Sequence, residues 1–453
     1  MNHTYGVDSE TGRLRAVLAH RPGAELRRIT PRDGHRLLFH GLPWVAGAQA
    51  EHDTLCEVLA ATGVGVRYVL DLLTGCLADP LARHEAIASA VCERGLGARL
   101  SEDLTTHLAG LDSDTLAQVL VGGLAVSEFR RGRGVVHGLL DRHDFLVPPL
   151  PHLVFTRDAS LWTGPLAVVA SLRSEGRQRE CALMDIVYRH HPEFAGTSVV
   201  TPSAAPLHGG DLVWLAPGAL AAGISERTSP AAVERLATRL FADGLAWTVL
   251  AVPTRQAPPG SRLDTVCTVI DASTLLMSPA LAYTLQAQAI TPADGGPRVS
   301  PPRPFLEAAA EAMGAGPLTV ISTGVEPPAA SSQQWDDGGN ALMIEPGLAV
   351  CHERNTETIA RLETAGVGVI RVPGSELGGG RGGPRAMICP VARDPAGAGL
   401  PLPPAAVSGP ALPAGHPSAP QPCQDLPVVA AVGEFASLAS PAAAEPGGPA
   451  PAW

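Results

Sequence analysis

The sequence predicts an α/β fold built from repeated units of two strands and a helix. Residues 148–393 alternate short apolar runs, which are typical of strands, with segments whose apolar residues recur at helical spacing. The predicted helices at residues 229–244 and 355–366 begin at Ser or Asn and end at Gly, as helices commonly do. Several pairs of apolar runs are joined by a Pro-Gly or Asp-Ala-Ser turn and precede a helix, which indicates an internal ββα repeat.

The individual elements follow from the same patterns. Near the N-terminus, residues 14–22 predict a strand that a proline ends, and residues 43–69 predict a helix, a glycine turn and a strand. Residues 284–316 are rich in Pro, Gly and Ala and predict a long loop with one helix at residues 304–314. The remaining predicted strands lie within residues 166–171, 198–201, 211–224, 247–252, 266–279, 318–322, 341–353 and 367–373.

The chain divides into four regions that differ in composition and in the spacing of apolar residues. Residues 1–70 and 141–394 have the strand–helix alternation and are expected to form the two parts of one α/β fold. Residues 71–140 have helical spacing throughout, with Asp or Ser at the starts, and predict a helical insertion. Residues 395–453 are a low-complexity run of Pro, Ala and Gly, which we expect to be disordered.

Composition narrows the classes of function. The 453-residue chain has a net charge of −11 and no block of Lys and Arg, so we expect neither nucleic acid nor a membrane as partner. The N-terminus has no signal-peptide pattern, and no apolar run is long enough to span a membrane. The eight cysteines are scattered without a CxxC pair, which favours a cytoplasmic protein with reduced thiols.

Polar side chains gather where five of the predicted strands begin or end. Asp158 and Asp264 could pair to bind a cation, and two planar, charge-assisted contacts suit a guanidinium group well. Arg177, Arg227 and Arg381 could hold a carboxylate. Together these residues describe a pocket for a zwitterion with a cationic end. The alternative is that each is an ordinary turn or salt-bridge residue.

Long motifs extend this interpretation. The stretches GVDSETGRLRAVLAHRPGAEL, GISERTSPAAVERLA, QWDDGGNALMIEPGLAVCHERN and SELGGGRGGPRAM resemble arginine deiminase, a family of the guanidino-modifying amidinotransferase superfamily. The resemblance covers residues 6–393 and leaves out only the tail. It implies a five-bladed α/β propeller of ββαβ units with a helical-bundle insertion, in agreement with the repeat. It also implies L-arginine or a related guanidino compound as ligand, and no cofactor; a homo-oligomer is left open.

The resemblance also assigns roles to residues. A cysteine thiolate of the family attacks the guanidinium carbon, and a histidine oriented by a glutamate transfers protons. Asp158 and Asp264 match the aspartates that bind the guanidinium. Arg177 and Arg227 match the arginines that bind the carboxylate, and Arg381 matches the arginine shortly before the nucleophile. The substituted positions are Ala386 for the cysteine, Arg262 for the histidine, His208 for the glutamate, His152 for an asparagine, and Phe39–Gly41 in the closing loop.

These substitutions remove the expected nucleophile, because an alanine methyl cannot attack carbon. Deleting a nucleophile typically costs about 10⁶ in rate. In an extended strand, Cys389 would point away from the face on which Ala386 lies, and Cys267 would point away from Asp264 in the same way. We therefore expect both thiols to be core residues rather than substitutes for the missing cysteine.

Arg262 suggests a further hypothesis. It lies two residues before Asp264, so both side chains would leave the same strand face, and its guanidinium could reach Asp158 or Asp264 and mimic a substrate. The alternative is that Arg262 turns to solvent. A metal site made of His152, His208, Asp158 and Asp264 is a weaker idea, because nearby arginines would repel a cation, and we predict no metal.

Three functions remain open at this point. The residues favour a family member with impaired catalysis, or a pseudoenzyme, which keeps the arginine-binding residues and binds arginine or a partner. Overall resemblance alone favours an active hydrolase that converts L-arginine to L-citrulline and ammonia. A third possibility is remodelled guanidino chemistry with His208 as the base.

Overall fold

The computed structural model describes residues 5–30, 42–92, 95–130, 132, 134–201, 205–255, 257, 261–324, 338–377 and 382–396. Three of the sequence-based expectations fall elsewhere. Arg381 and the segment Phe39–Gly41 lie outside the described residues, and so does the predicted tail apart from residues 395–396.

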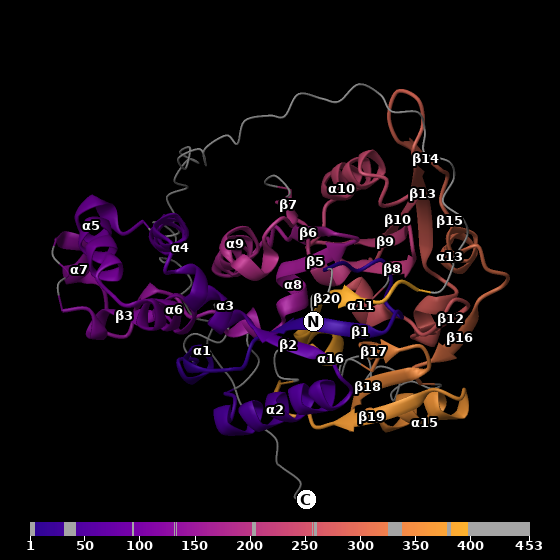
Figure 1. Ribbon diagram of the computed structural model, residues 1–453, viewed down its shortest axis with the longest axis horizontal. Coiled ribbons are helices and arrows are strands. Elements are labelled where there is room, and N and C mark those ends of the chain that lie inside the picture. Colours follow the sequence, from indigo (N-terminus) through magenta and orange to yellow (C-terminus); the bar gives the residue numbers. More distant parts are fainter. Residues whose placement is uncertain are drawn as a thin grey trace, which may run out of the picture. The chain divides into compact units, whose positions relative to one another are not determined.

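Five sheets in the described part of the chain repeat one arrangement of strands (Figure 1). Each has an antiparallel pair of strands, then a helix, then a third strand that runs parallel to the second. This is the ββα repeat that the apolar runs predicted, with the third strand completing each unit. The α/β fold class is therefore confirmed.

The bounds of these units follow the chain from its middle onward. The first two are β5 (Ser160–Thr163), β6 (Leu166–Val169), α9 (Glu175–His190) and β7 (Ser198–Val200), then β8 (Leu212–Ala216), β9 (Ala219–Ile224), α10 (Pro230–Ala242) and β10 (Thr248–Pro253). The next two are β11 (Cys267–Val269), β12 (Thr274–Met277), α13 (Phe305–Met313) and β16 (Thr319–Ser322), then β17 (Leu342–Glu345), β18 (Leu348–His352), α15 (Thr356–Thr364) and β19 (Gly368–Val372).

The fifth unit joins the two ends of the described chain. Strand β20 (Cys389–Arg393) pairs antiparallel with β1 (Leu14–Ala19), and β1 pairs parallel with β2 (Gly65–Tyr68) after α2 (Val45–Ala61). The Arg393 guanidinium donates to the carbonyl of Gly12 at 2.7 Å, which adds a side-chain bond to the same junction. One sheet thus depends on segments more than 300 residues apart.

Local sequence explains the tight turns between paired strands. Gly218 and Gly347, each preceded by a proline, have φ values of 77° and 81°. Proline fixes the first central residue of such a turn and glycine tolerates the positive φ of the second, so Pro-Gly pairs form hairpin turns readily. The turn prediction made from these dipeptides is confirmed.

The region 284–316 was predicted incompletely. It contains α13 as expected, but it also contains a strand that pairs antiparallel with β10 and extends that sheet. The run QAQAIT is too short and too polar to stand out as a strand, and it is held by its neighbour rather than by its own propensity. The strands of this region are β13 (Gln286–Thr291), β14 (Arg298–Val299) and β15 (Arg303–Pro304), and the short helix α12 (Pro279–Ala282) comes just before it.

Helices dominate the segment between β2 and β5, and Figure 1 shows them gathered to one side of the sheets. Their apolar faces and those of neighbouring strands form one core cluster, in which Leu73 and Leu120 join Trp162 and Val168. No helix of the described residues is long and apolar enough to cross a membrane. The elements of this segment are α3 (Val69–Cys76), α4 (Pro80–Cys92), α5 (Gly97–Ala109), α6 (Ser113–Gly122), β3 (Leu124–Ala125), α7 (Val135–Leu139) and β4 (Phe145–Val147). The short helix α1 (Ala24–Arg27) lies earlier in the chain, between β1 and α2.

Candidate functional site

Short helical turns place Asp158, Asp264 and Ala386 at equivalent points of the repeated units. Such a turn precedes the first strand of four of the five sheets. Thr156 links one of these turns to another and to β1, because its hydroxyl lies within hydrogen-bond distance of the carbonyls of Leu18 and Met387, at 3.0 and 2.9 Å. The turns are α8 (Thr156–Ala159), η4 (Gly209–Asp211), α11 (Leu263–Val266) and α16 (Pro384–Met387).

These turns correct one premise of the sequence analysis. Ala386 and Asp264 were expected to lie in extended strands, but both lie in single helical turns. The argument that Cys389 and Cys267 face away by strand alternation is therefore wrong, although both thiols are buried. Cys389 Sγ instead lies 3.5 Å from Ser160 Oγ, and its side chain belongs to the core.

Asp158 lies at the centre of a buried cluster of charges. Its Oδ2 is 3.1 Å from Arg177 Nη2 and 3.6 Å from His208 Nε2, and the carboxylate is 2 % exposed. Arg177 also bonds Glu180, which lies one turn further along α9. Burial disfavours the charge of Arg177, but the carboxylates of Glu180 and Asp158 outweigh this and raise its pKa.

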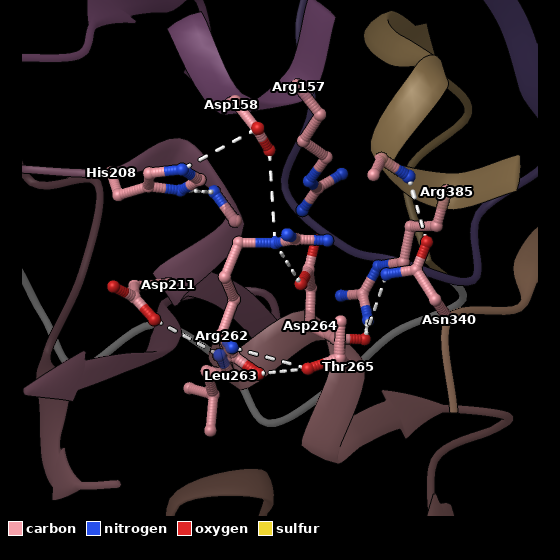
Figure 2. A network of polar contacts seen from close by, with 12 residues as sticks. Arg157, Asp158, His208, Asp211, Arg262, Leu263, Asp264, Thr265, Asn340 and Arg385 are labelled. Atoms are coloured by element: carbon pink, nitrogen blue, oxygen red, sulfur yellow. Dashed lines mark hydrogen bonds and ion pairs between the residues drawn. The ribbon is translucent and has the colours of Figure 1, made fainter. Parts of the chain in front are cut away.

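Arg262 lies between the two predicted aspartates (Figure 2). Its Nε is 3.1 Å from Asp264 Oδ1 and 3.9 Å from Asp158 Oδ1. The side chain is buried, so the alternative that Arg262 turns to solvent is wrong. The structure thus brings Asp158 and Asp264 together, as predicted, with a guanidinium of the same chain beside them.

The backbone around Arg262 is shaped to receive it. A Cβ added at Gly210 would lie 2.8 Å from Arg262 Cδ and 2.9 Å from its Nε, closer than real Cβ contacts. The stem of Arg262 therefore rests on the bare backbone of Gly210. Arg262 also caps its own turn, because its N–H donates to Thr265 Oγ1 at 3.2 Å and its carbonyl accepts from that hydroxyl at 2.8 Å.

His208 is neutral in this environment. Burial first, and then the charges of Arg177, Arg262 and Arg227, lower its pKa well below the ordinary value. Its Nδ1 accepts the N–H of Gly210 at 3.1 Å, which leaves the proton of the neutral ring on Nε2, facing Asp158. In this tautomer His208 is a donor toward the cluster.

Asp211 is a buried carboxylate that sequence reasoning missed. It accepts hydrogen bonds from Thr228 Oγ1 at 2.7 Å, Ser225 Oγ at 3.0 Å and the N–H of Leu263 at 3.1 Å. Burial raises its pKa to about 6 in spite of these bonds. Through Leu263, Asp211 fixes the turn that carries Arg262 and Asp264. Its place in the HGGD stretch was the available signal.

Ala386 is fully buried and its backbone is anchored. Its N–H donates to Asn340 Oδ1 at 3.0 Å, and Asn340 Nδ2 donates to the carbonyl of Asp264 at 3.2 Å (Figure 2). Asn340 therefore links the turn of Ala386 to that of Asp264. The glycines before Ala386 allow close packing, because Gly382 and Gly383 lie so close to Phe155 and Asn340 that a Cβ would clash.

A second buried cluster of charges surrounds Glu10, next to the turns that carry Asp158 and Ala386. Glu10 contacts the guanidinium groups of Arg157 and Arg385, the latter at 3.2 Å, and Arg393 lies near enough to affect it. Burial opposes the charge of Glu10, but the three arginines together lower its pKa to about 2. Because Arg157 and Arg385 are neighbours of Asp158 and Ala386, this cluster positions both turns. None of its members was predicted.

The other predicted residues are placed less decisively. His152 lies on η2 (Pro151–Val154) and its ring packs against Phe155, with centroids 5.9 Å apart. Arg227 is half-buried beside Ser225, and burial and then the charge of Arg262 lower its pKa. Among the described residues, no group of three or more His, Cys, Asp or Glu side chains could hold a metal ion.

Comparison with known proteins assigns this arrangement to a family. The family model described as arginine deiminase matches residues 35–393. The chain belongs to the arginine deiminase family. An arginine deiminase from Rhodococcus erythropolis is 48% identical over 395 residues, which cover 86% of this chain and 98% of that protein. One from Mycobacterium tuberculosis is 49% identical over 396 residues, with the same coverage.

A solved structure supports the fold alone. An amidinotransferase of the saxitoxin biosynthetic pathway from Microseira wollei is 13% identical, with a TM-score of 0.50 over 88% of this chain and 99% of that one. The family match and the two relatives confirm the resemblance to arginine deiminase. The family match includes the turns that carry Asp158, Asp264 and Ala386, and also His208 and Arg262.

Proposed function

We propose that this chain is an arginine deiminase-family protein that has lost thiolate catalysis and acts by binding arginine, a related guanidino compound or a partner. The single observation that carries the proposal is Ala386, a buried methyl in the turn where the resemblance expects the nucleophilic cysteine. The charged frame around it, with Asp158, Asp264 and Arg177, is intact.

Other thiols support this proposal by their positions. Six cysteines, Cys56, Cys76, Cys181, Cys267, Cys351 and Cys389, are buried, and burial raises the pKa of each of these thiols. A reactive cysteine needs thiolate character and access, and these groups have neither. Cys181 is near enough for Asp158 and Glu180 to raise its pKa further. None of these thiols is a good substitute nucleophile.

The remaining features of the proposal rest on the family and the topology. The five repeated sheets, closed by the pairing of β20 with β1, favour a five-bladed propeller. We place the protein in the cytoplasm and expect neither nucleic acid nor a membrane as partner, because the chain is acidic and its described cysteines are free. Its oligomeric state stays a prediction.

A second candidate is an active hydrolase that converts L-arginine to L-citrulline and ammonia. The specific observation in its favour is the 48% and 49% identity to arginine deiminases over nearly their whole length. Overall similarity favours this function more strongly than it favours impaired catalysis. It would require another attacking group, and His208 is a poor base because its Nε2 carries the proton in the tautomer set by Gly210.

The test is incubation of the purified chain with L-arginine and measurement of citrulline. We expect no citrulline above the background of a heat-treated sample. The triple variant Ala386→Cys, Arg262→His and His208→Glu restores the family pattern and should produce citrulline if the frame is intact. Citrulline from the native chain, abolished by Asp158→Asn, would instead establish the hydrolase.

A further inference from the structure

We infer that Arg262 is a built-in occupant of the guanidinium subsite, which makes the site selective against free arginine. The inference rests on the proposed function, because that function locates the subsite at Asp158 and Asp264. It goes further by assigning a positive role to a substituted residue. Arg262 determines which ligands the site can take, rather than merely marking a lost histidine.

The first support is geometric. The Arg262 Nε lies within 3.1 Å of Asp264 Oδ1 and 3.9 Å of Asp158 Oδ1, so one guanidinium contacts both carboxylates (Figure 2). An arginine ligand would bring the same group with the same charge to the same two partners. The two guanidinium groups cannot occupy this position together.

The second support is electrostatic. Asp158 and Asp264 are 2 % and 0 % exposed, and two buried like charges are stable only when cations compensate them. Arg177 compensates Asp158 at 3.1 Å, whereas Arg262 makes the close ion pair with Asp264. A guanidinium ligand would bring the cation that compensates Asp264 only while it is bound. Arg262 supplies that cation permanently.

The third support is the state of the carboxylate oxygens. Asp158 Oδ1 and Asp264 Oδ2 are buried, and neither has a hydrogen-bond partner among the described residues. Arg262 contributes its charge through Nε but leaves these two acceptors without hydrogen bonds. Removal of Arg262 should therefore uncover a site with two spare acceptors and two negative charges, which matches a free guanidinium.

The stem of Arg262 is also accommodated rather than forced in. It lies on Gly210, where any side chain would collide with Cδ and Nε. Its backbone is fixed by Thr265 and, through Leu263, by Asp211. The residue is thus held by contacts that depend on neither Asp158 nor Asp264, as a permanent occupant requires.

Calorimetric titration and thermal unfolding with L-arginine test the inference. We expect no binding and no change in Tm for the native chain. Arg262→Ala and Arg262→His should both bind L-arginine, with a rise in Tm of several degrees at saturating ligand. L-Citrulline, which has nearly the same shape without the charge, should leave the Tm of both variants unchanged.

Two controls keep the outcome decisive. Arg371→Ala removes an exposed arginine, paired with Glu363 at 2.7 Å, and should bind no more arginine than the native chain. If Arg262→Ala fails to fold, Arg262→His carries the test, because it restores the residue that the family resemblance expects there. Arginine binding by the native chain at micromolar concentration would overturn the inference, as would failure of both variants to bind.

The same samples separate this inference from the proposed function. An inactive native chain that binds arginine refutes the occupant while leaving the loss of catalysis standing. A native chain that releases citrulline refutes the loss of catalysis itself. Inactivity, no arginine binding by the native chain and binding by the variants support the loss of catalysis and the occupant together. They then leave a ligand other than free arginine, or a partner, as what the native chain binds.

Discussion

Arg262 and Asp264 form a buried ion pair in which each charge compensates the other. Breaking such a pair from one side leaves an uncompensated charge and costs about 3–5 kcal/mol of the free energy of unfolding. Arg262→Ala and Asp264→Asn should therefore each destabilise the chain strongly. The double variant should lose at least about 1 kcal/mol less in the free energy of unfolding than the two single losses added together.

Urea unfolding of the native chain and the three variants measures this coupling. The exposed pair of Arg371 and Glu363 is the matched control, because surface pairs contribute about 0–1 kcal/mol. Additive effects in the Arg262 and Asp264 cycle would show that the two side chains do not stabilise each other.

His52 gives a prediction about pH. Burial lowers its pKa to about 3 from an unfolded value near 6.5, so between these limits the unfolded chain binds a proton that the folded chain does not. Stability is complete above pH 6.5 and falls as the pH falls. Between pH 7 and pH 5 this residue should cost about 2 kcal/mol.

Unfolding experiments at the two pH values check the contribution of His52. His52→Gln should lose less stability on acidification than the native chain by about that amount. Asp211, whose pKa burial raises to about 6, acts in the opposite direction in both proteins and cancels in the comparison. His84→Gln, at an exposed position, should behave like the native chain. Identical slopes for all three would contradict the assigned burial effect.

Residue-scale prediction from the sequence succeeded where the chemistry was local. Asp158, Asp264 and Arg262 were expected to meet, and they do, although the reason is a helical turn rather than a shared strand face. Glu10 and Asn340 were missed because their partners lie far away in the sequence. Glu10 and Arg157 are 147 positions apart, and no local sequence pattern indicates that they pair.

At the scale of elements, the Glu10 cluster holds three segments together. Arg157 belongs to α8, Arg385 to α16 and Arg393 to β20, and all three surround one carboxylate. Glu10→Gln would leave three buried cations without their shared anion. We expect a loss of about 3–5 kcal/mol in the free energy of unfolding.

Chemical denaturation followed by circular dichroism measures the effect of Glu10→Gln. The matched control is Glu345→Gln, since Glu345 is 39% exposed and lies 3.5 Å from Arg13. The control should lose less than about 1 kcal/mol. Equal, small losses in both variants would mean that the cluster does not support the turns.

Elements were predictable from the sequence where apolar periodicity was strong. The paired strands β8 and β9, β11 and β12, and β17 and β18, together with the helices α10, α13 and α15, lie where their patterns placed them. The strands β13 to β15 were missed because short polar segments gain their structure from a neighbouring strand. The turns α8, α11 and α16 are too short to give a helical pattern.

At the scale of the whole molecule, β20 closes the fifth sheet. Its side chains Cys389 and Val391 are buried, and it pairs with β1 near the other end of the chain. A chain ending after residue 388 should therefore not fold cooperatively. A chain ending after residue 396 keeps β20 and should have the Tm of the full-length protein, because the sequence predicts that the tail does not pack.

Differential scanning calorimetry distinguishes these truncations. A cooperative transition for the shorter chain would contradict closure by β20. A large loss of Tm for the longer one would show that the tail contributes to the fold, contrary to the prediction from its composition.

The central claim is that a family fold with an intact charged frame lacks the atom that does the chemistry. The most direct test is a side-by-side measurement of citrulline release by this chain and by the Mycobacterium tuberculosis relative, under the same conditions. Loss of a nucleophile predicts a rate about 10⁶-fold lower for this chain. A rate within about tenfold of the relative would contradict the claim, because the barrier difference would then be no more than about 1.4 kcal/mol.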